Sequence, residues 1–253
     1  MTRACGTGLS RLAVRADIYL VHHGYYASRA RAQQAIKAGR VKANGKAVKK
    51  SSDKIAENAQ IIADKAHPWV SRGGLKLAHA LENFGVDPSA KICLDVGAST
   101  GGFTDVLISM GALRVYAVDV GHSQLHESLK SNPKIISMES RDARGLTLDD
   151  FSASPELFVC DASFISATKV LAASLALAAT GAELVTLVKP QFEVGKAGIG
   201  KGGLVKSKSL SQQALADVSA WIKAQGWTVR STCDSPIKGG SGNHEYLLYA
   251  VKL

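Results

Sequence analysis

Four charged residues fall where a parallel α/β sheet would bring them to one edge. Asp161 and Lys189 each end an apolar run, and Glu245 opens the last apolar run of the chain. Lys76 lies in a helical stretch that precedes these runs. Ligands of open α/β sheets bind at the carboxyl ends of the strands, and a buried ammonium is costly unless carboxylates balance it. The four residues therefore suit a site that orients a hydroxyl group and helps it lose its proton, with ordinary surface ion pairs as the alternative.

A glycine-rich segment predicts a ligand site beside them. Residues 95–103, DVGASTGGF, follow a buried strand and open a helix. Glycines let the backbone approach a ligand closely, and a helix N-terminus favours an anionic group. Asp119 ends the next strand, where a carboxylate can accept hydrogen bonds from ribose hydroxyls, and Asp142 follows the third. The alternative is a tight turn in which the aspartates only cap strands. The predicted ligand-contacting residues are Asp95, Gly97, Ala98, Ser99, Thr100, Gly101, Gly102, Phe103, Asp119 and Asp142.

Two other motifs are incomplete. Gly195–Lys201 matches the GxxxxGK of a phosphate-binding loop, but the Ser or Thr that would hold magnesium is missing, and no helix is predicted directly after it. We interpret this segment as a mobile loop whose Lys196 and Lys201 could touch phosphate groups, with a plain linker as the alternative. His122 and His126 are four residues apart but lack the glutamate of HExxH, so we expect no metal site.

The basic charge is concentrated in the first quarter of the chain. The net charge is +10, and residues 1–66 carry 13 basic and 4 acidic residues, whereas residues 67–253 carry 18 and 17. A basic module attached to a nearly neutral one indicates a polyanionic partner, because neutralising phosphates releases their counterions. This favours nucleic acid over a basic surface that is merely solvated.

Residues 1–66 predict a small α+β domain. Ser28 can cap a helix that Gly39 ends, and Asn44-Gly45 is a strong two-residue turn signal. The predicted elements are a helix within residues 15–26, a helix over 29–37, a hairpin over 41–48 and a short strand pair over 55–62.

Residues 71–253 predict a doubly wound α/β domain, which follows a hinge over residues 67–70 at Pro68. Apolar strands alternate with helices, as a parallel sheet covered on both faces requires. The predicted strands are 91–95, 115–119, 134–140, 157–161, 183–189, 227–233 and 244–251. The predicted helices are 75–84, 103–110, 167–179 and 209–225.

Composition excludes several classes of protein. Apolar residues are 46% and charged residues 21%, which is ordinary for a globular protein, and no run approaches the ~18 apolar residues of a membrane span. The first 17 residues contain no continuous apolar core, so they do not suit a secretory signal. The cysteines form no CxxC pair, which argues against a zinc ribbon or a disulfide framework and favours a cytoplasmic protein. They are Cys5, Cys93, Cys160 and Cys233.

The first domain resembles the S4 RNA-binding domain. The pattern SRxxAxxxIxxGxVxxNGxxV of that family is matched from Ser28 to Val48. The resemblance implies contact with structured RNA through phosphates and shape. The residues it implicates are Arg29, Arg31, Lys37, Arg40, Lys42 and Lys46.

The second domain resembles class I methyltransferases that use S-adenosylmethionine (SAM). The motif DxGxxxGG at 95–102 is similar to their first motif, and Lys76, Asp161, Lys189 and Glu245 follow the order of the tetrad of FtsJ-like ribose 2′-O-methyltransferases. Together with VSRGGLK, DASFIS, LVKPQFEVGK and SGNHEY, these motifs make nearly the whole chain similar to the TlyA family of rRNA methyltransferases. The resemblance implies a Rossmann-like seven-stranded sheet with helices on both faces.

The resemblance also implies a reaction, the methylation of a cytidine 2′-hydroxyl of ribosomal RNA in ribosomal subunits. Lys189 would contact the attacking oxygen, as a neutral base or as a charged stabiliser of the developing alkoxide. Asp161 would hold Lys189, while Lys76 and Glu245 would orient the ribose. Longer family members, extended at both ends, are associated with acting on both subunits, so 23S rRNA is favoured here and 16S rRNA is the alternative. The rival functions are a membrane-active haemolysin, a label often given to similar proteins, and a non-catalytic RNA-binding ribosome-assembly factor.

Overall fold

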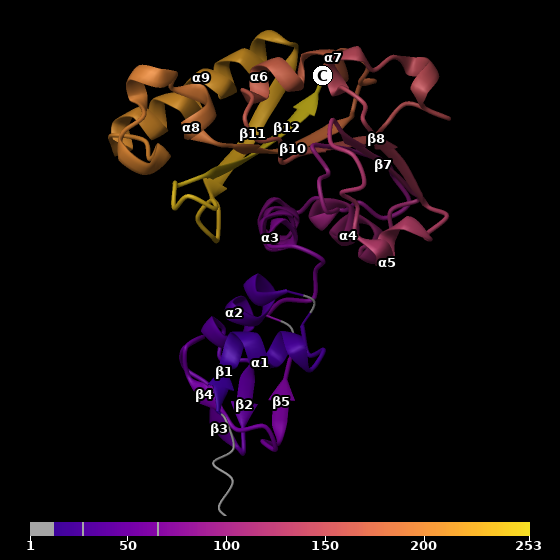
Figure 1. The fold of residues 1–253 in the computed structure, drawn as a ribbon. Coiled ribbons are helices and arrows are strands. Elements are labelled where there is room, and N and C mark those ends of the chain that lie inside the picture. The colour runs from indigo at the N-terminus through magenta and orange to yellow at the C-terminus, as the bar shows by residue number, and fades with distance from the viewer. Residues whose placement is uncertain (1–12, 27, 65) are drawn as a thin grey trace, which may run out of the picture. The chain divides into compact units, whose positions relative to one another are not determined.

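The computed structural model describes residues 13–26, 28–64 and 66–253, and the chain divides into two compact units, residues 1–68 and 69–253 (Figure 1). Cys5 and most of the segment considered above as a secretory signal, residues 1–12, lie outside the described residues. Among the described residues, no helix is both long and apolar enough to cross a membrane.

The first unit contains two helices and two small sheets. Ser28 caps the second helix by accepting a hydrogen bond from the backbone N–H of Arg31 (3.4 Å), as predicted. Asn44 and Gly45 both adopt positive φ angles, 49° and 75°, which confirms the predicted hairpin turn. Its elements are β1 (Val14–Arg15), α1 (Ala16–His22), α2 (Arg29–Lys37), β2 (Val41–Ala43), β3 (Lys46–Ala47), β4 (Lys54–Ile55) and β5 (Ile61–Ala63).

The strand pair predicted over residues 55–62 is wrong. Both strands exist, but β4 pairs with β1 and β5 pairs with β2, in two different sheets. Each strand is only two or three residues long, so the core beneath it decides its partner rather than its neighbour in sequence. Ile55 is buried in the core of this unit together with Leu20 and Val41.

The second unit has the predicted fold, a seven-stranded sheet covered by helices on both faces. The strand order is β11-β12-β10-β9-β6-β7-β8, and β12 is antiparallel to both of its neighbours while the other pairs are parallel. The strands are β6 (Ile92–Val96), β7 (Arg114–Asp119), β8 (Ile135–Glu139), β9 (Leu157–Cys160), β10 (Glu183–Val188), β11 (Trp227–Asp234) and β12 (Tyr246–Lys252).

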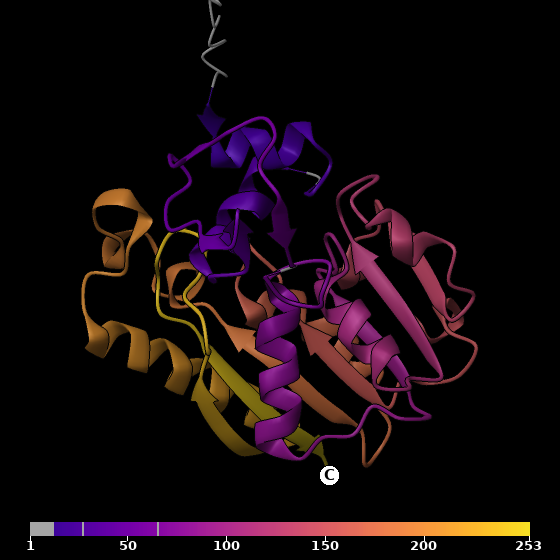
Figure 2. The same cartoon turned by 90° about the horizontal axis from the view of Figure 1, so that it is seen from below.

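Side chains alternate between the two faces of the sheet, so each face has its own core. One core packs against α3 and α4 through residues such as Cys93 and Val185, and the other packs against α6, α7 and α9 through Leu94 and Leu184. Figure 1 shows these two layers, and Figure 2 looks onto the face that α3 covers. The helices are α3 (Gly73–Phe84), α4 (Gly102–Ser109), α5 (Glu127–Lys130), α6 (Ala167–Val170), α7 (Ala172–Ala176), α8 (Pro190–Glu193) and α9 (Lys208–Ala224). The single helix predicted over 167–179 is therefore two short helices.

Candidate active site

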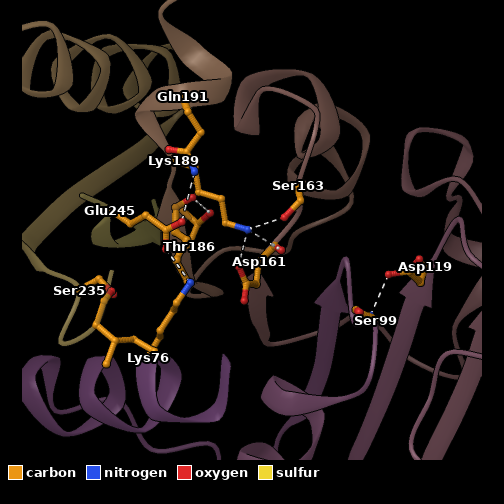
Figure 3. A network of polar contacts seen from close by, with 12 residues as sticks. Lys76, Ser99, Asp119, Asp161, Ser163, Thr186, Lys189, Gln191, Ser235 and Glu245 are labelled. Atoms are coloured by element: carbon orange, nitrogen blue, oxygen red, sulfur yellow. Dashed lines mark hydrogen bonds and ion pairs between the residues drawn. The ribbon is translucent and has the colours of Figure 1, made fainter. Parts of the chain in front are cut away.

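The structure brings the four charged residues together at one edge of the sheet. Asp161 follows β9 and Lys189 follows β10, and these strands are parallel neighbours whose carboxyl ends coincide. Lys76 projects from α3, and Glu245 directly precedes β12. They form two ion pairs, Lys189 Nζ to Asp161 Oδ1 at 2.6 Å and Lys76 Nζ to Glu245 Oε2 at 2.6 Å (Figure 3).

Both lysines of these pairs are buried. The side chains of Lys76 and Lys189 are 10% and 8% exposed, and that of Glu245 is 3% exposed. Charges taken out of water in this way interact more strongly with each other and with any ligand than surface charges do, and they also cost desolvation energy. These are therefore not the surface ion pairs that the sequence left open as the alternative.

The Lys189 ammonium has further partners from the segment after β9. Its Nζ donates to the backbone carbonyl of Asp161 (3.0 Å) and to the hydroxyl of Ser163 (2.8 Å). Asp161 Oδ1 is buried and close to Nζ, yet it accepts no hydrogen bond of regular geometry. Three oxygens thus surround an ammonium that has three N–H groups.

Two cavities meet at this site. The first, of about 620 Å³, is lined by all four residues of the two ion pairs and by the glycine turn from Gly97 onwards. The second, of about 570 Å³, contains Asp119 and Asp142. Five residues line both cavities, namely Gly97, Ser99, Asp161, Ser163 and Phe164. A ligand that extends from the second cavity into the first would pass these residues and reach the two lysines.

Close packing around the turn favours glycine at three of its positions, because a side chain there would meet neighbouring segments. A Cβ on Gly97, which has a φ of 80°, would lie 2.8 Å from the Cα of Ala162 in the segment that carries Asp161. A Cβ on Gly101 would meet Leu125 and Leu129, and one on Gly102 would meet Ser71 and the start of α3. These contacts hold the turn, α3 and the 161–164 segment against one another. Gly101 lines neither cavity, whereas Ala98, Thr100, Gly102 and Phe103 line the first.

Asp95, one of the predicted ligand-contacting residues, lies away from both cavities. Its side chain is fully buried beneath α4, where Oδ2 accepts a hydrogen bond from Thr104 (2.7 Å) and Oδ1 has no partner. It lines neither cavity, because alternation along β6 turns it toward the core. Burial raises the pKa of its carboxyl to about 7.

Asp119 and Asp142 both line the second cavity, as the prediction requires. Asp119 accepts hydrogen bonds from the backbone N–H groups of Ser99 (2.8 Å) and Gly121 (2.7 Å), which fixes the glycine turn to the end of β7. Asp142 pairs with Arg144 at 2.6 Å, and the hydrogen bonds from Arg144 lower the pKa of its carboxyl to about 2. Each carboxylate has lone pairs left for a ligand.

Sequence reasoning missed three residues of the site. Ser163 binds Lys189, Gln191 Nε2 lies 3.4 Å from Glu245 Oε1, and Phe164 is 93% exposed with a φ of 67° beside Phe192. A strained, exposed aromatic residue at a cavity is a signature of function, since neither packing nor backbone preference explains it. The sequence offered one signal for them. Each lies within three residues of Asp161 or Lys189, the charged residues that directly follow a strand.

Glu193 ties the two segments of the site together. Its carboxylate accepts hydrogen bonds from the hydroxyl of Ser166 (2.6 Å) and the backbone N–H of Ala167 (2.8 Å). The segment after β10, with Lys189, is thereby held to the segment after β9, with Asp161.

The segment 195–206 is a turn held by hydrogen bonds. Gly200 N–H donates to Leu204 (2.7 Å), and the buried Asn243 accepts from Val205 (3.0 Å) and donates to Gly203 (2.8 Å). No helix begins directly after the GxxxxGK match, because α9 starts at Lys208, so the segment lacks the geometry of a phosphate-binding loop.

The basic residues of the first unit have a different setting. Arg29 pairs with Asp17 at 2.8 Å, and Asp17 is fully buried while Arg29 is 57% exposed. Asp17 also pairs with Arg15 and accepts a hydrogen bond from Gln33. Arg31 is half-buried, and the other predicted RNA-contacting residues, Lys37, Arg40, Lys42 and Lys46, are exposed.

Comparison with known proteins gives two family matches and several close relatives. Residues 69–252 match the model of FtsJ-like methyltransferases, and residues 14–61 match that of the S4 domain. The chain is 41% identical over 237 residues to the 16S/23S rRNA (cytidine-2′-O)-methyltransferase TlyA of Mycobacterium tuberculosis, covering 93% of this chain and 88% of that one. It is 39% identical to Hemolysin A of Brachyspira hyodysenteriae, covering 94% and 100%. A solved structure from Streptococcus thermophilus, described as a candidate hemolysin, matches with a TM-score of 0.74 at 37% identity, covering 96% and 90%.

Proposed function

The chain belongs to the TlyA family, with an S4 domain and an FtsJ-like methyltransferase domain, and on this premise we propose that it methylates the ribose 2′-hydroxyl of a cytidine in ribosomal RNA. The observation that carries the proposal is the pair of buried lysine–carboxylate ion pairs facing one cavity, which adjoins the glycine turn. The proposed catalytic residues are Lys76, Asp161, Lys189 and Glu245.

The second cavity fits the nucleoside part of SAM. It combines apolar walls, such as Val118 and Ile165, with the carboxylate of Asp119, which suits a base and a ribose respectively. Gly97 and Ser99 continue the path into the first cavity, where the methionine part would lie. When bound, SAM supplies a methyl group already activated by a positive sulfur, so the protein needs mainly to align the acceptor oxygen.

Lys189 acts in its charged form. Its three oxygen neighbours stabilise the ammonium, which in turn stabilises the negative charge that develops on the 2′-oxygen as its proton leaves. Bound SAM would supply its methyl group to that oxygen and would be left as a neutral sulfide. Asp161 Oδ1, beside Nζ and without a regular hydrogen bond, is the nearest base for the released proton. This favours the charged-stabiliser role over the neutral-base role.

The second ion pair orients the acceptor. Lys76 and Glu245 lie in the same cavity, and Gln191 contacts the other carboxylate oxygen of Glu245. An ammonium and a carboxylate held in place can bind the hydroxyls of a ribose on both the donor and the acceptor side.

Phe164 provides a place for the base. Its ring is exposed beside Phe192 at the junction of the two cavities. Enzymes that work on nucleotides of folded RNA take the target out of its stack, and aromatic rings replace the lost stacking. The S4 domain would supply the contacts to phosphate, since it carries most of the net charge.

The decisive experiment uses ribosomal subunits from a strain that lacks this gene. The purified protein and radiolabelled SAM should place a methyl group on one cytidine ribose, mapped by nuclease digestion and mass spectrometry in both 16S and 23S rRNA. Asp161→Ala should bind the subunits and transfer no methyl group. A protein that binds subunits without any transfer would be an assembly factor, and methylation of a base or a protein would also contradict the proposal.

A further inference from the structure

Three oxygens lie within 3.0 Å of Lys189 Nζ, and two of them accept hydrogen bonds from it. Two of these oxygens belong to Asp161, its backbone carbonyl at 3.0 Å and its carboxylate Oδ1 at 2.6 Å, and the third is Ser163 Oγ at 2.8 Å. An ammonium has only three protons to donate. A substrate oxygen that approaches Nζ therefore competes with these three oxygens for the ammonium.

Ser163 is the partner that can give up its place. The carbonyl of Asp161 is fixed by the backbone at the end of β9, and the carboxylate carries the charge that balances the buried ammonium. The Ser163 hydroxyl is neutral, belongs to an exposed residue and can turn away by rotation about one bond. Losing it costs the ammonium one neutral hydrogen bond, which an incoming hydroxyl replaces.

The place that Ser163 holds is the one where reaction should occur. Ser163 lines both cavities, and its hydroxyl binds the ammonium that the proposed function places at the acceptor oxygen. Figure 3 shows it on the side of Lys189 that faces away from Lys76 and toward Ser99 of the glycine turn and Asp119 at the end of β7. A ribose hydroxyl has the same chemistry as a serine hydroxyl and can accept the same hydrogen bond from Nζ.

We propose that Ser163 Oγ occupies the position of the attacking ribose 2′-oxygen in the free protein and that substrate binding displaces it from Lys189. The inference rests on the proposed function. Ser163 is then a positioning residue that keeps the buried ammonium satisfied between reactions, and it takes no part in the methyl transfer itself. It competes with the substrate for a single N–H group.

The test separates substrate affinity from reaction rate. Subunits from the strain lacking the gene are titrated with each variant in the presence of S-adenosylhomocysteine, so that no turnover occurs. Ser163→Ala should bind them about two- to tenfold more tightly than wild type, because no internal hydrogen bond has to be broken first. Its single-turnover rate with SAM at saturating subunits is measured beside the affinity, so that an effect on binding is separated from an effect on the reacting complex.

Two variants control the experiment. Ser163→Thr keeps the hydroxyl and should bind like wild type. Ser219→Ala removes a serine hydroxyl from α9, where it bonds only to Leu215 O within the helix, and should change neither affinity nor rate.

The opposite results would overturn the proposal. Unchanged or weaker binding by Ser163→Ala, or a rate more than tenfold below wild type, would mean that the hydroxyl contacts the substrate or helps Lys189 in the reaction. Tighter binding by Ser163→Thr as well would show that the effect does not come from the hydroxyl. If wild type and Ser219→Ala also transfer no methyl group, the proposed function itself fails, which is a distinct outcome.

Discussion

Both units of the chain bury carboxylates against cations, but only the first unit leaves the cations exposed. In the first unit Asp17 is fully buried, while Arg15 and Arg29 extend into solvent. In the second unit the lysines are buried along with Glu245. A guanidinium that is paired with a buried carboxylate on one side can donate hydrogen bonds to a phosphate from its exposed side. A buried ammonium instead acts on a group that enters a cavity. Under the proposed function, the same kind of pairing would serve a binding surface in one unit and a chemical site in the other.

The pairs also differ in how far apart their members lie in the chain. Asp17 is 2 and 12 residues from its arginines, whereas Lys76 and Glu245 are 169 residues apart. The first arrangement forms within two adjacent helices, and the second requires the whole sheet to assemble. The chemical site should consequently be lost when any strand of the sheet is disturbed, and the first unit should be insensitive to such changes.

The largest effect should come from Lys189→Ala. Methyl transfer should fall by about 10²–10⁴-fold, since the ammonium stabilises the developing charge, while affinity for S-adenosylhomocysteine stays within a few fold. The matched control is Lys91→Ala, which removes a lysine paired with Glu183 that lines neither cavity. Both are measured by single-turnover transfer and by calorimetric titration. Full activity of Lys189→Ala would mean that methyl transfer does not need the buried ammonium. The proposed contrast between a catalytic site in the second unit and a binding surface in the first would then fail.

The positions of single elements were well predicted because their signals are local. The Ser28 cap, the Asn44-Gly45 turn and the apolar strands β6 and β10 depend on a few consecutive residues. Strand pairing is not local, so the partners of β4 and β5 were predicted wrongly. The direction in which Asp95 points, into the core, was not foreseen, because a motif marks the segment near a ligand but does not say which of its side chains reach it.

The pattern of apolar runs predicts a residue of the site only where that residue stands at the end of a strand. Lys189 and Asp161 were found in this way, and the geometry brings them together. Ser163 and Phe164 lie in the loop after β9, and Gln191 lies in the single turn of α8 after β10, where no periodicity constrains a side chain. Ser163 contacts Lys189 because β9 and β10 end side by side, and Gln191 contacts Glu245 because β10 and β12 are neighbours.

The second largest effect is expected from a substitution of Asp17, the buried carboxylate of the first unit. Asp17→Ala leaves Gln33 and the two arginines without their shared acceptor, and it should destabilise this unit by about 3 kcal/mol, at the lower end for a broken buried pair because the arginines remain hydrated. Hydrogen exchange in α1 and β4 measures this, with α4 as the internal control. Equal loss of protection in α4 would contradict the independence of the two units.

The pH dependence of that unit follows from the same group. Hydrogen bonds from Arg15, and then from Arg29 and Gln33, hold the pKa of Asp17 well below its usual range despite its burial. Because the folded pKa is the lower one, this stabilisation is present above pH ~4 and is lost as the pH falls below it. In Asp17→Asn, the part of the acid-induced loss of stability that comes from this carboxylate should be absent.

The exposed cations of the first unit should matter for RNA affinity and for its dependence on salt. Replacing Arg40, Lys42 and Lys46 by Glu should weaken binding to ribosomal subunits by about 10–100-fold and flatten the plot of log affinity against log salt concentration. Affinity for S-adenosylhomocysteine should not change. The control makes the same change in net charge at the exposed Lys134, Lys169 and Lys223 of the second unit. An unchanged slope in the first variant, or an equal loss in the control, would show that total charge matters rather than this surface.

The smallest effect sharpens the comparison, because Asp95 is a buried carboxylate without a cation. Burial raises its pKa to about 7, and only the hydrogen bond from Thr104 opposes this. The folded state therefore holds a proton that the unfolded state releases near pH 4, so the second unit loses stability as the pH rises from about 4 through 7. Asp17 has the opposite sign, since it adds stability over the range where its pKa lies below that of the unfolded chain.

Asp95→Asn should cancel the loss in the second unit. The variant cannot ionise, so its free energy of unfolding relative to wild type should rise by about 2 kcal/mol between pH 5 and pH 8. Urea unfolding followed by hydrogen exchange in β6 and α4 measures this, with Asp149→Asn, an exposed carboxylate, as the control. A difference that stays flat over this range would mean that Asp95 does not titrate there. The carboxylate would then be held charged by its surroundings, as Asp17 is, and the contrast between the two units would be limited to their cations.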